Sequence, residues 1–368
     1  MIWVLVLILY TILIFSLAFG ITKVDEFKCK KNSPKSKFSI LIPYRNEAEN
    51  LPKLLQSIYK IKYPKELFEF IFINDDSSDN SSTIIKEKLN STLFNYSIIN
   101  NKRASNSPKK DAITTAIIIA KNKWIITTDA DCVLPKTWLS TLDNFIQKNN
   151  PNMVVSPVNY IAKENYLEQF QLLDFLSLQG ATIGGFGVNF PFLCNGANLA
   201  YKKETFNTLK GFEGNNSVAS GDDIFLFEKF LNSNKESVLY LKSKDVIVNT
   251  YPVKTWKELI NQRTRWAAKT SIIKSLNVKM IGFIILATHM LVISYLFMGS
   301  LKTMFIPLTI KIIVDWFLFK LTTRFFNIKI KFLKWYFLSS LLYPFFSIYI
   351  FLNSLFFKYE WKERQFKK

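Results

Sequence analysis

The stretch FEFIFINDDSSD at residues 68–79 places an apolar run, Phe68 to Ile73, directly before an acidic turn. The same order occurs upstream in FSILIPYRNE at residues 38–47, where Phe38 to Ile42 precedes a polar segment. Each apolar run is typical of a buried strand. Asp, Asn and Ser favour turns and helix caps, so each polar segment could be an ordinary turn. A carboxylate at a strand end could also accept a hydrogen bond from a nucleotide base or ribose.

Strand and helix patterns alternate outward from these two runs, between about Phe38 and Asn277. We expect further strands at Tyr96–Ile99 and Trp124–Thr128, and helices at Glu49–Tyr59, Ser82–Leu89, Asp111–Ala120 and Ile224–Leu231. This alternation predicts βαβ units and a mostly parallel sheet. Ligands bind outside the carboxyl ends of the strands in such sheets, and the polar segments fall there.

Apolar runs flank this α/β region, which we place at residues 36–277. Ile2 to Ile21 is uncharged and long enough to span a bilayer, so we expect a transmembrane helix over residues 1–22. Lys311 and Asp315 interrupt a later run and, at i,i+4, could pair on one helix face. Three later runs predict two to three spans over residues 278–358: Met280–Met298, Thr303–Phe319 and Trp335–Phe357. A helix near residues 254–276 could lie in the membrane interface, and residues 359–368 form a basic tail.

The net charge of +20 is compatible with binding either to nucleic acid or to an anionic membrane surface. The basic residues crowd beside the apolar runs, which favours the membrane, so we expect no nucleic-acid partner. They include Lys23, Lys28, Lys30 and Lys31, and Lys329, Lys331 and Lys334. Because basic loops stay inside, we expect a multi-pass protein of the cell inner membrane with its α/β domain in the cytoplasm.

Few residues suit His- or Cys-based chemistry. The three cysteines, Cys29, Cys132 and Cys194, lie far apart without metal-type spacing, which predicts a reducing compartment and no disulfide framework. The single histidine, His289, lies in an apolar run. A Ser-His-Asp triad and a His-rich metal site are therefore not expected.

Asp129-Ala130-Asp131 follows the fourth expected strand. Carboxylates at i and i+2 of an extended segment point to opposite faces, so the chain must bend to bring them together. Together they suit Mg²⁺ or Mn²⁺ bridged to diphosphate oxygens, whereas a lone Asp-x-Asp is compatible with a solvated loop. Lys109, at the start of the preceding expected helix, could meet a phosphate or face solvent.

Two further motifs carry charge near helices. Ser220-Gly221-Asp222-Asp223 precedes the expected helix at Ile224, where the dipole favours an ionised carboxylate. That group could cap the helix, or it could act as a general base. In Gln262-Arg263-Thr264-Arg265-Trp266, Arg265 could clamp a diphosphate and Trp266 could stack on a sugar. The alternative for this motif is an amphipathic helix on the membrane surface.

Taken in order, these motifs resemble family 2 glycosyltransferases of the inverting GT-A type, near the membrane-bound polysaccharide synthases. The resemblance covers roughly Phe38 to Lys269, and the flanking spans also match. It implies a GT-A, Rossmann-like α/β catalytic domain with a mostly parallel central sheet and N- and C-terminal transmembrane helices. Its motifs are Pro43-Tyr44-Arg45-Asn46-Glu47, Asn74-Asp75-Asp76-Ser77, Lys109, Asp129-Ala130-Asp131, Asn195-Gly196-Ala197-Asn198, Gly221-Asp222-Asp223 and Gln262-Arg263-Thr264-Arg265-Trp266.

The resemblance also implies a role for each motif. Asp223 would be the general base, with Asp222 beside it, and Asp131 with Asp129 would hold Mg²⁺ or Mn²⁺. The donor nucleotide would be bound by Pro43, Tyr44, Arg45, Glu47, Asp75, Asp76, Lys109 and Asp129. The acceptor and diphosphate would be bound by Asn195, Gly196, Asn198, Gln262, Arg265 and Trp266.

The activity implied is inverting transfer of a hexose from a nucleotide-diphosphate sugar, expected to be a UDP-sugar, to a glycan or lipid-linked acceptor in polysaccharide biosynthesis. Two features depart from the family pattern: Pro108 replaces a glycine before Lys109, and Gly221-Asp222-Asp223 replaces Thr-Glu-Asp. Few spans follow the catalytic domain, so processive polysaccharide synthesis stays an alternative. Three further classes of protein stay open: a membrane-bound nucleotidyltransferase, a transporter or scaffold with a nucleotide-sensing domain, and a basic nucleic-acid binder.

Overall fold

The structure is a computed structural model of the 368-residue chain. It describes residues 2–30, 32–90, 94–215, 220–270, 273, 275–298, 300, 302–328, 333–362 and 364–366. Lys329, Lys331 and the end of the basic tail lie outside the described residues. The chain divides into an α/β unit, Asp25–Ile161 with Cys194–Tyr251, and a helical unit, Met1–Val24, Ala162–Leu193 and Pro252–Lys368.

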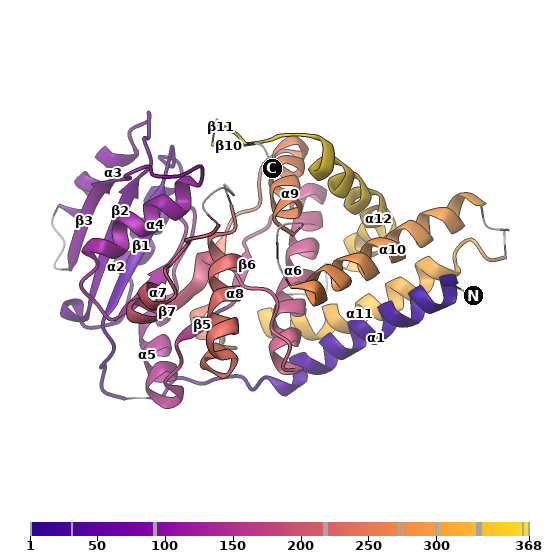
Figure 1. Ribbon diagram of the computed structural model, residues 1–368, viewed down its shortest axis with the longest axis horizontal. Coiled ribbons are helices and arrows are strands. Elements are labelled where there is room, and N and C mark those ends of the chain that lie inside the picture. The colour runs from indigo at the N-terminus through magenta and orange to yellow at the C-terminus, as the bar shows by residue number, and fades with distance from the viewer. Residues whose placement is uncertain are drawn as a thin grey trace. The chain divides into compact units, whose positions relative to one another are not determined.

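The α/β unit is built on a seven-stranded sheet with the order β3-β2-β1-β4-β7-β5-β8. Figure 1 labels β1, β2, β3, β5 and β7 of this sheet. Neighbouring strands from β3 to β4 run parallel, β7 runs antiparallel to both β4 and β5, and β8 is parallel to β5. The strands are β1 (Phe38–Tyr44), β2 (Phe68–Asn74), β3 (Asn95–Asn100), β4 (Trp124–Thr127), β5 (Met153–Val155), β7 (Leu199–Lys202) and β8 (Val238–Tyr240). A second, two-stranded parallel sheet pairs β6 (Val158–Tyr160) with β9 (Val248–Thr250). The mostly parallel sheet expected from the sequence is therefore confirmed.

Apolar side chains explain why these segments form the centre of the unit. Ile40, Leu41, Phe70 and Phe72 are fully buried, as expected for strands covered on both faces. Helix α4 packs against β1 and β2. The helices of the unit are α2 (Leu51–Tyr59), α3 (Ser81–Leu89), α4 (Pro108–Ile119), α5 (Trp138–Asn149), α7 (Lys203–Thr208) and α8 (Asp222–Asn234). Its 3₁₀ turns are η1 (Lys65–Leu67), η2 (Gly196–Asn198), η3 (Lys235–Ser237) and η4 (Lys244–Val246).

Helices α4 and α8 begin earlier than the sequence predicted, and both starts matter for the site. Helix α4 begins at Pro108 rather than Asp111, because proline is tolerated in the first turn. Helix α8 begins at Asp222, after Gly221 at a φ of 86°. Glycine adopts this left-handed conformation without a steric cost. Lys109, Asp222 and Asp223 therefore lie in first helical turns.

The helical unit contains three helices long and apolar enough to cross a membrane, among the residues described: Trp3–Lys23, Leu276–Met298 and Lys334–Phe356. Many of their apolar side chains are exposed, including Phe19, Phe283 and Phe337. The helices of this unit are α1 (Ile2–Lys23), α6 (Tyr166–Gly187), α9 (Trp256–Thr270), α10 (Leu276–Met298), α11 (Ile306–Phe326) and α12 (Leu333–Phe356). The tail forms an antiparallel pair, β10 (Tyr359–Trp361) and β11 (Arg364–Phe366).

Buried charges in α11 are paired. Lys311 Nζ lies 2.5 Å from Asp315 Oδ2, which confirms the pairing expected from their i,i+4 spacing. The hydroxyl of Tyr10, from α1, donates to the other oxygen of Asp315 at 2.5 Å. A buried charge is costly unless paired and hydrogen-bonded, so this arrangement lets α11 carry two charges inside an apolar bundle.

Glycines allow α1 and α6 to pack backbone against backbone. A Cβ added at Gly184 would lie 2.3 Å from the carbonyl oxygen of Leu17, and one at Gly187 would lie 1.8 Å from that of Gly20. Small residues at helix contacts let backbones approach closely in membranes. The position of α1 on α6 therefore depends on the absence of side chains at these sites.

We predict that Gly184→Ala lowers the thermal unfolding midpoint of the full chain in detergent. An extra methyl group at a filled contact costs about 1–3 kcal/mol, although alanine is the better helix former by about 1 kcal/mol. Gly282→Ala on α10 is the matched control, because nothing lies within 4 Å of its added Cβ. This control should keep or raise the midpoint. An equal fall in both variants would contradict the close packing.

Candidate active site

Loops from four strands meet at one edge of the large sheet. The parallel pairing sets Tyr44 opposite Asn74 and Leu41 opposite Thr127, so the segments after β1, β2 and β4 leave the sheet on the same side. Strand β7 is antiparallel and begins at Leu199, opposite Thr127. The loop that precedes β7 therefore reaches the same edge.

Lys109, in the first turn of α4, joins the segment after β4 to the start of α8. Its Nζ lies 2.6 Å from Asp129 Oδ1, after β4, and 3.1 Å from Asp222 Oδ2, in the first turn of α8. Burial alone would lower the pKa of the Lys109 ammonium, but the two carboxylates outweigh burial and raise that pKa above its ordinary value. Lys109 is therefore a cation fixed between two anions that come from distant parts of the chain.

Gly196, in the loop before β7, lies against this cluster. A Cβ at Gly196 would be 3.2 Å from Asp222 Oδ2 and 3.2 Å from the Cβ of Asp223. Its amide N donates to Asp223 Oδ2 at 3.3 Å, and its carbonyl oxygen accepts from Thr127 Oγ1 at 2.8 Å. A larger residue would push the loop and the carboxylates apart, which accounts for glycine at this position.

Asp223 is held at the N-terminus of α8. Its Oδ1 accepts from the amide N of Ile224 at 2.8 Å, while its Oδ2 faces Gly196. The helix dipole favours an ionised carboxylate here. The geometry thus presents an anionic group, fixed by two backbone amides, beside the Lys109 cluster.

The turns after β1 and β2 are tied to each other. Arg45 Nη1 donates to the carbonyl oxygens of Asp75, at 2.9 Å, and Asp76, at 2.6 Å. Asn46 and Asp76 both adopt positive φ, 51° and 62°, and Asn46 Oδ1 accepts from the amide N of Ser78 at 2.9 Å. Arg45 therefore fixes the acidic turn, and the side chain of Asp76 stays 86% exposed.

Asp75 has partners that the sequence did not indicate. Its Oδ1 accepts from Asn101 Nδ2 at 2.6 Å and lies 3.8 Å from Arg103 Nη1. Asn101 follows β3, so it reaches the same sheet edge as the other polar segments. Applying the strand-end rule to the third strand would have found it.

The remaining predicted donor residues also lie in or just after β1. Pro43 and Tyr44 end the strand, and the Tyr44 hydroxyl is hydrogen-bonded to Ser82 Oγ at 2.7 Å. Glu47 accepts from Asn50 Nδ2 at 2.7 Å and is nearly buried. These contacts hold the first turn of the site in one conformation.

The chain bends after β4, as the Asp-x-Asp spacing required. The strand ends at Thr127, and the amide N of Cys132 donates back to the carbonyl of Asp129 at 3.2 Å. Burial and the neighbouring carboxylates of Asp131 and Asp129 raise the pKa of the Cys132 thiol, so the thiol stays protonated.

Among the described residues no cluster of three or more His, Cys, Asp or Glu could hold a metal ion. Two carboxylates nevertheless fit Mg²⁺ or Mn²⁺, which complete their shells with phosphate oxygens and water.

The two asparagines of the 195–198 loop hold the loop itself. Asn195 Oδ1 accepts from the amide N of Ala197 at 2.9 Å. Asn198 Oδ1 accepts from Trp138 Nε1 at 2.9 Å, and its Nδ2 donates to the carbonyls of Pro157 and Val246. With its side chain buried and bonded on both atoms, Asn198 favours a role in fixing Gly196 rather than in touching a ligand.

Gln262, Arg265 and Trp266 lie on α9, in the helical unit. Between them, the buried Arg263 donates from Nε to Asp174 Oδ2 at 2.5 Å, bonds Gln262 Oε1, and lies 4.2 Å from the Trp266 ring centroid. Tyr343 donates to the other oxygen of Asp174 at 2.6 Å. Arg263, whose role the sequence did not reveal, therefore orients two residues of the motif. The part that the motif plays in the site stays a prediction.

We predict that Lys109→Met lowers the thermal unfolding midpoint near pH 7, because Asp129 and Asp222 are left facing each other. The loss should be about 1–3 kcal/mol, between the values for exposed and buried pairs, since the Asp129 side chain is 39% exposed. In the wild type the pKa of Lys109 is raised above the ordinary lysine value of about 10.5. The contribution of Lys109 to the free energy of unfolding is therefore complete below about pH 10.5 and is lost only as the pH rises through the raised pKa.

Lys109→Arg, which keeps the cation, is the control for this series and should retain most of the midpoint. A Lys109→Met deficit no larger than the Lys109→Arg deficit near pH 7 would contradict the electrostatic explanation.

Comparison with known proteins places this chain in one family. The model of glycosyl transferase family 2 matches residues 39–207, and that of glycosyl transferase family group 2 matches residues 124–357. The probable glycosyltransferase YdaM of Bacillus subtilis is 24% identical over 242 residues, covering 63% of this chain and 54% of YdaM. The poly-β-1,6-N-acetyl-D-glucosamine synthase of Staphylococcus epidermidis is 28% identical over 145 residues, covering 39% of this chain and 33% of the synthase.

A solved structure supports the fold over nearly the whole chain. The mannosyltransferase PcManGT from Pyrobaculum calidifontis, in complex with GDP-Man and Mn²⁺, is 14% identical and has a TM-score of 0.57. The similarity covers 96% of each chain. The curated relatives are longer: this chain spans about half or less of their length. The model of glycosyl transferase family group 2 covers more than half of the chain, and that of glycosyl transferase family 2 matches the α/β part, so the protein belongs to the family 2 glycosyltransferases.

Proposed function

We propose that the protein is an inverting glycosyltransferase that moves a sugar from a nucleotide-diphosphate sugar, a UDP-sugar, to a glycan or lipid-linked acceptor. The observation that carries this proposal is the cluster in which Lys109 joins Asp129 to Asp222, beside Gly196 and Asp223. It combines a fixed cation, carboxylates suited to a metal, and an anionic group suited to take a proton.

The donor nucleotide would lie along the turns after β1 and β2. Glu47, Asp75 and the exposed Asp76 offer carboxylate oxygens to base and ribose donors, with Pro43, Tyr44 and Arg45 shaping the turn. Because its pKa is raised, Lys109 stays cationic and would meet the diphosphate. A cation placed where negative charge develops on a leaving group lowers the barrier to its departure.

Asp131 and Asp129 would hold the divalent cation, Mg²⁺ or Mn²⁺. When bound, it would act as a Lewis acid that neutralises negative charge on the diphosphate. Asp129 already accepts from Lys109, so it would share its two oxygens between the lysine and the ion, which leaves Asp131 as the more direct ligand.

The proposed reaction is a single displacement at the anomeric carbon. Asp223 takes the proton of the acceptor hydroxyl, and the acceptor oxygen forms its bond to the anomeric carbon from the face opposite the diphosphate. The bond between that carbon and the diphosphate oxygen breaks with its electron pair leaving on the diphosphate, so the configuration inverts. The amides of Gly196 and Ile224 hold the Asp223 carboxylate in place for this step.

Asn195 and Gly196, from the loop before β7, would bind the acceptor. The sequence motif of α9 alone assigns Gln262, Arg265 and Trp266 to the acceptor and the diphosphate. Arg263 would act as a positioning residue for the α9 side chains, because it contacts both Gln262 and Trp266 while Asp174 holds it.

The three apolar helices and the basic segments beside them support a multi-pass protein of the inner membrane with the α/β unit on the cytoplasmic side.

Asp223→Asn should lower the rate of sugar transfer by about 10²–10⁴-fold, because an amide cannot take the acceptor proton. Binding of the donor, measured separately by titration with a UDP-sugar, should persist. Asp245→Asn, an exposed carboxylate of the same unit, is the matched control and should keep wild-type turnover. Turnover near the wild-type value in Asp223→Asn would exclude Asp223 as the base.

Removal of divalent cations with EDTA should stop transfer, and Mn²⁺ or Mg²⁺ should restore it. Asp131→Asn should raise the metal concentration needed for half-maximal activity by about 10–100-fold, because a ligand is lost while the fold is kept. The measurement is release of the nucleoside diphosphate against metal concentration. Full transfer by metal-free protein would rule out the metal role.

A further inference from the structure

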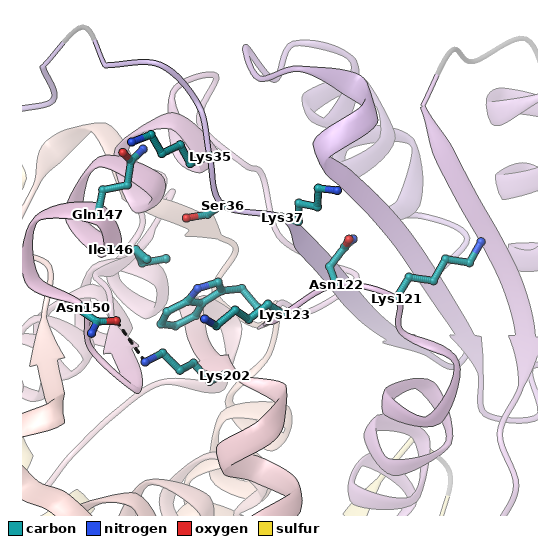
Figure 2. Close-up of a pocket in the computed structure, with 11 residues that line it drawn as sticks. Lys35, Ser36, Lys37, Lys121, Asn122, Lys123, Ile146, Gln147, Asn150 and Lys202 are labelled. Carbon is teal, nitrogen blue, oxygen red and sulfur yellow. Dashed lines mark hydrogen bonds between the residues drawn. The ribbon is translucent and has the colours of Figure 1, made fainter.

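A pocket of about 460 Å³ opens at the sheet edge opposite the Lys109 cluster (Figure 2). Lys37, which directly precedes β1, and Trp124, the first residue of β4, line the pocket. Lys202, the last residue of the antiparallel β7, lines it as well. The cluster of Lys109 and its carboxylates lies beyond the other ends of these strands. The pocket is therefore separate from the proposed donor site.

Lysines dominate the wall of this pocket. Figure 2 shows Lys35, Gln147 and Lys202 on one side and Lys37, Asn122 and Lys121 on the other, with Lys123 between them. No Asp or Glu is among the described residues that line it. Ser36, Asn122, Gln147 and Asn150 add neutral polar groups. Five cations without a carboxylate make the pocket complementary to an anion.

Two buried carboxylates lie behind the pocket and fix the backbone that carries the lysines. Asp143 accepts from the amides of Ser36, at 2.9 Å, and Lys35, at 3.3 Å. Glu69 accepts from the amide of Lys121 at 2.7 Å and from Ser39 Oγ at 2.6 Å. Because these carboxylates bond backbone amides, they order the lysine-bearing segments through the main chain.

Lys202 is held in the pocket wall. Its Nζ donates to Asn150 Oδ1 at 3.2 Å, and the pKa of its ammonium is lowered by burial and by the nearby cation Lys123. The amide of the next residue, Lys203, donates to the carbonyl of Lys123 at 2.9 Å, which keeps the two lysine segments side by side. An anion between Lys123 and Lys202 would relieve their repulsion.

We propose that this pocket is an anion-binding site for a phosphate-bearing ligand, distinct from the sugar-donor site. The phosphate oxygens would accept from several lysine ammonium groups, which gives short, charge-assisted hydrogen bonds. The volume lies within the range of about 300–1,000 Å³ typical of small-molecule sites. The ligand is either a free phosphorylated molecule or the headgroup of an anionic lipid, and the chemistry recognised is the same.

The test follows the acetylation rate of each lysine in the full chain by mass spectrometry. One arm adds inorganic tripolyphosphate to protein in phosphatidylcholine nanodiscs, and the other replaces part of that lipid with phosphatidylglycerol. In one of the two arms, acetylation of the pocket residues Lys35, Lys37, Lys123 and Lys202 should slow by about fivefold at near-saturating ligand. The exposed Lys60 and Lys62 of the same unit should be unaffected. The responding arm identifies the source of the phosphate.

Lys37→Glu with Lys123→Glu should abolish protection of Lys35 and Lys202, whereas the charge-matched control Lys60→Glu with Lys62→Glu should keep it. Sugar transfer without added ligand should be the same in both variants, since neither pair belongs to the catalytic machinery. Absence of protection in both arms, or equal protection of Lys60 and Lys62, would overturn the proposal. The readout is lysine acetylation rather than sugar transfer, so the result is independent of the proposed enzyme activity.

Discussion

The site depends on a cation held between carboxylates that would otherwise repel each other. Asp129 and Asp222 come from the end of β4 and the start of α8, and Lys109 contacts both. Two like charges about 4 Å apart repel by about 1 kcal/mol in water and about 4 kcal/mol near a protein surface. The Lys109 ammonium attracts both carboxylates and so offsets their mutual repulsion. It also explains why the starts of α4 and α8 and the turn after β4 must meet at one point.

The fold and the local part of the site could be predicted from the sequence, because both rest on short-range patterns. The apolar run Phe68 to Ile73 and its acidic turn are neighbours in the chain, so strand and strand-end polarity are visible together. The contact of Lys109 with Asp222 joins residues far apart in the chain, and no spacing reports it. Likewise a motif shows that Asn198 belongs to a loop but not that its amide is bonded to Trp138 and two carbonyls.

Ion pairing explains how the helical unit buries charged residues that lower the hydropathy of its helices. Lys311 and Asp315 lower the apolar character of α11, yet they bond each other and Tyr10 inside the bundle. Asp174 and Arg263 do the same between α6 and α9, with Tyr343 on the second carboxylate oxygen. The second pair reaches Gln262 and Trp266, so its cost in burial is offset by the order it gives to these two side chains.

The charges of the α/β unit are distributed unevenly over the two edges of its sheet. Carboxylates gather where β1, β2 and β4 end, and lysines gather where β1 and β4 begin. Strand β4 has only four residues, so the two edges are roughly 10 Å apart at this strand. A diphosphate would be repelled from the carboxylate edge unless Lys109 and a divalent cation compensated for it. Under the proposed function this uneven distribution would act as a selection: an anion that brings no metal would be drawn to the lysine pocket, and a metal-bound nucleotide sugar to the carboxylates.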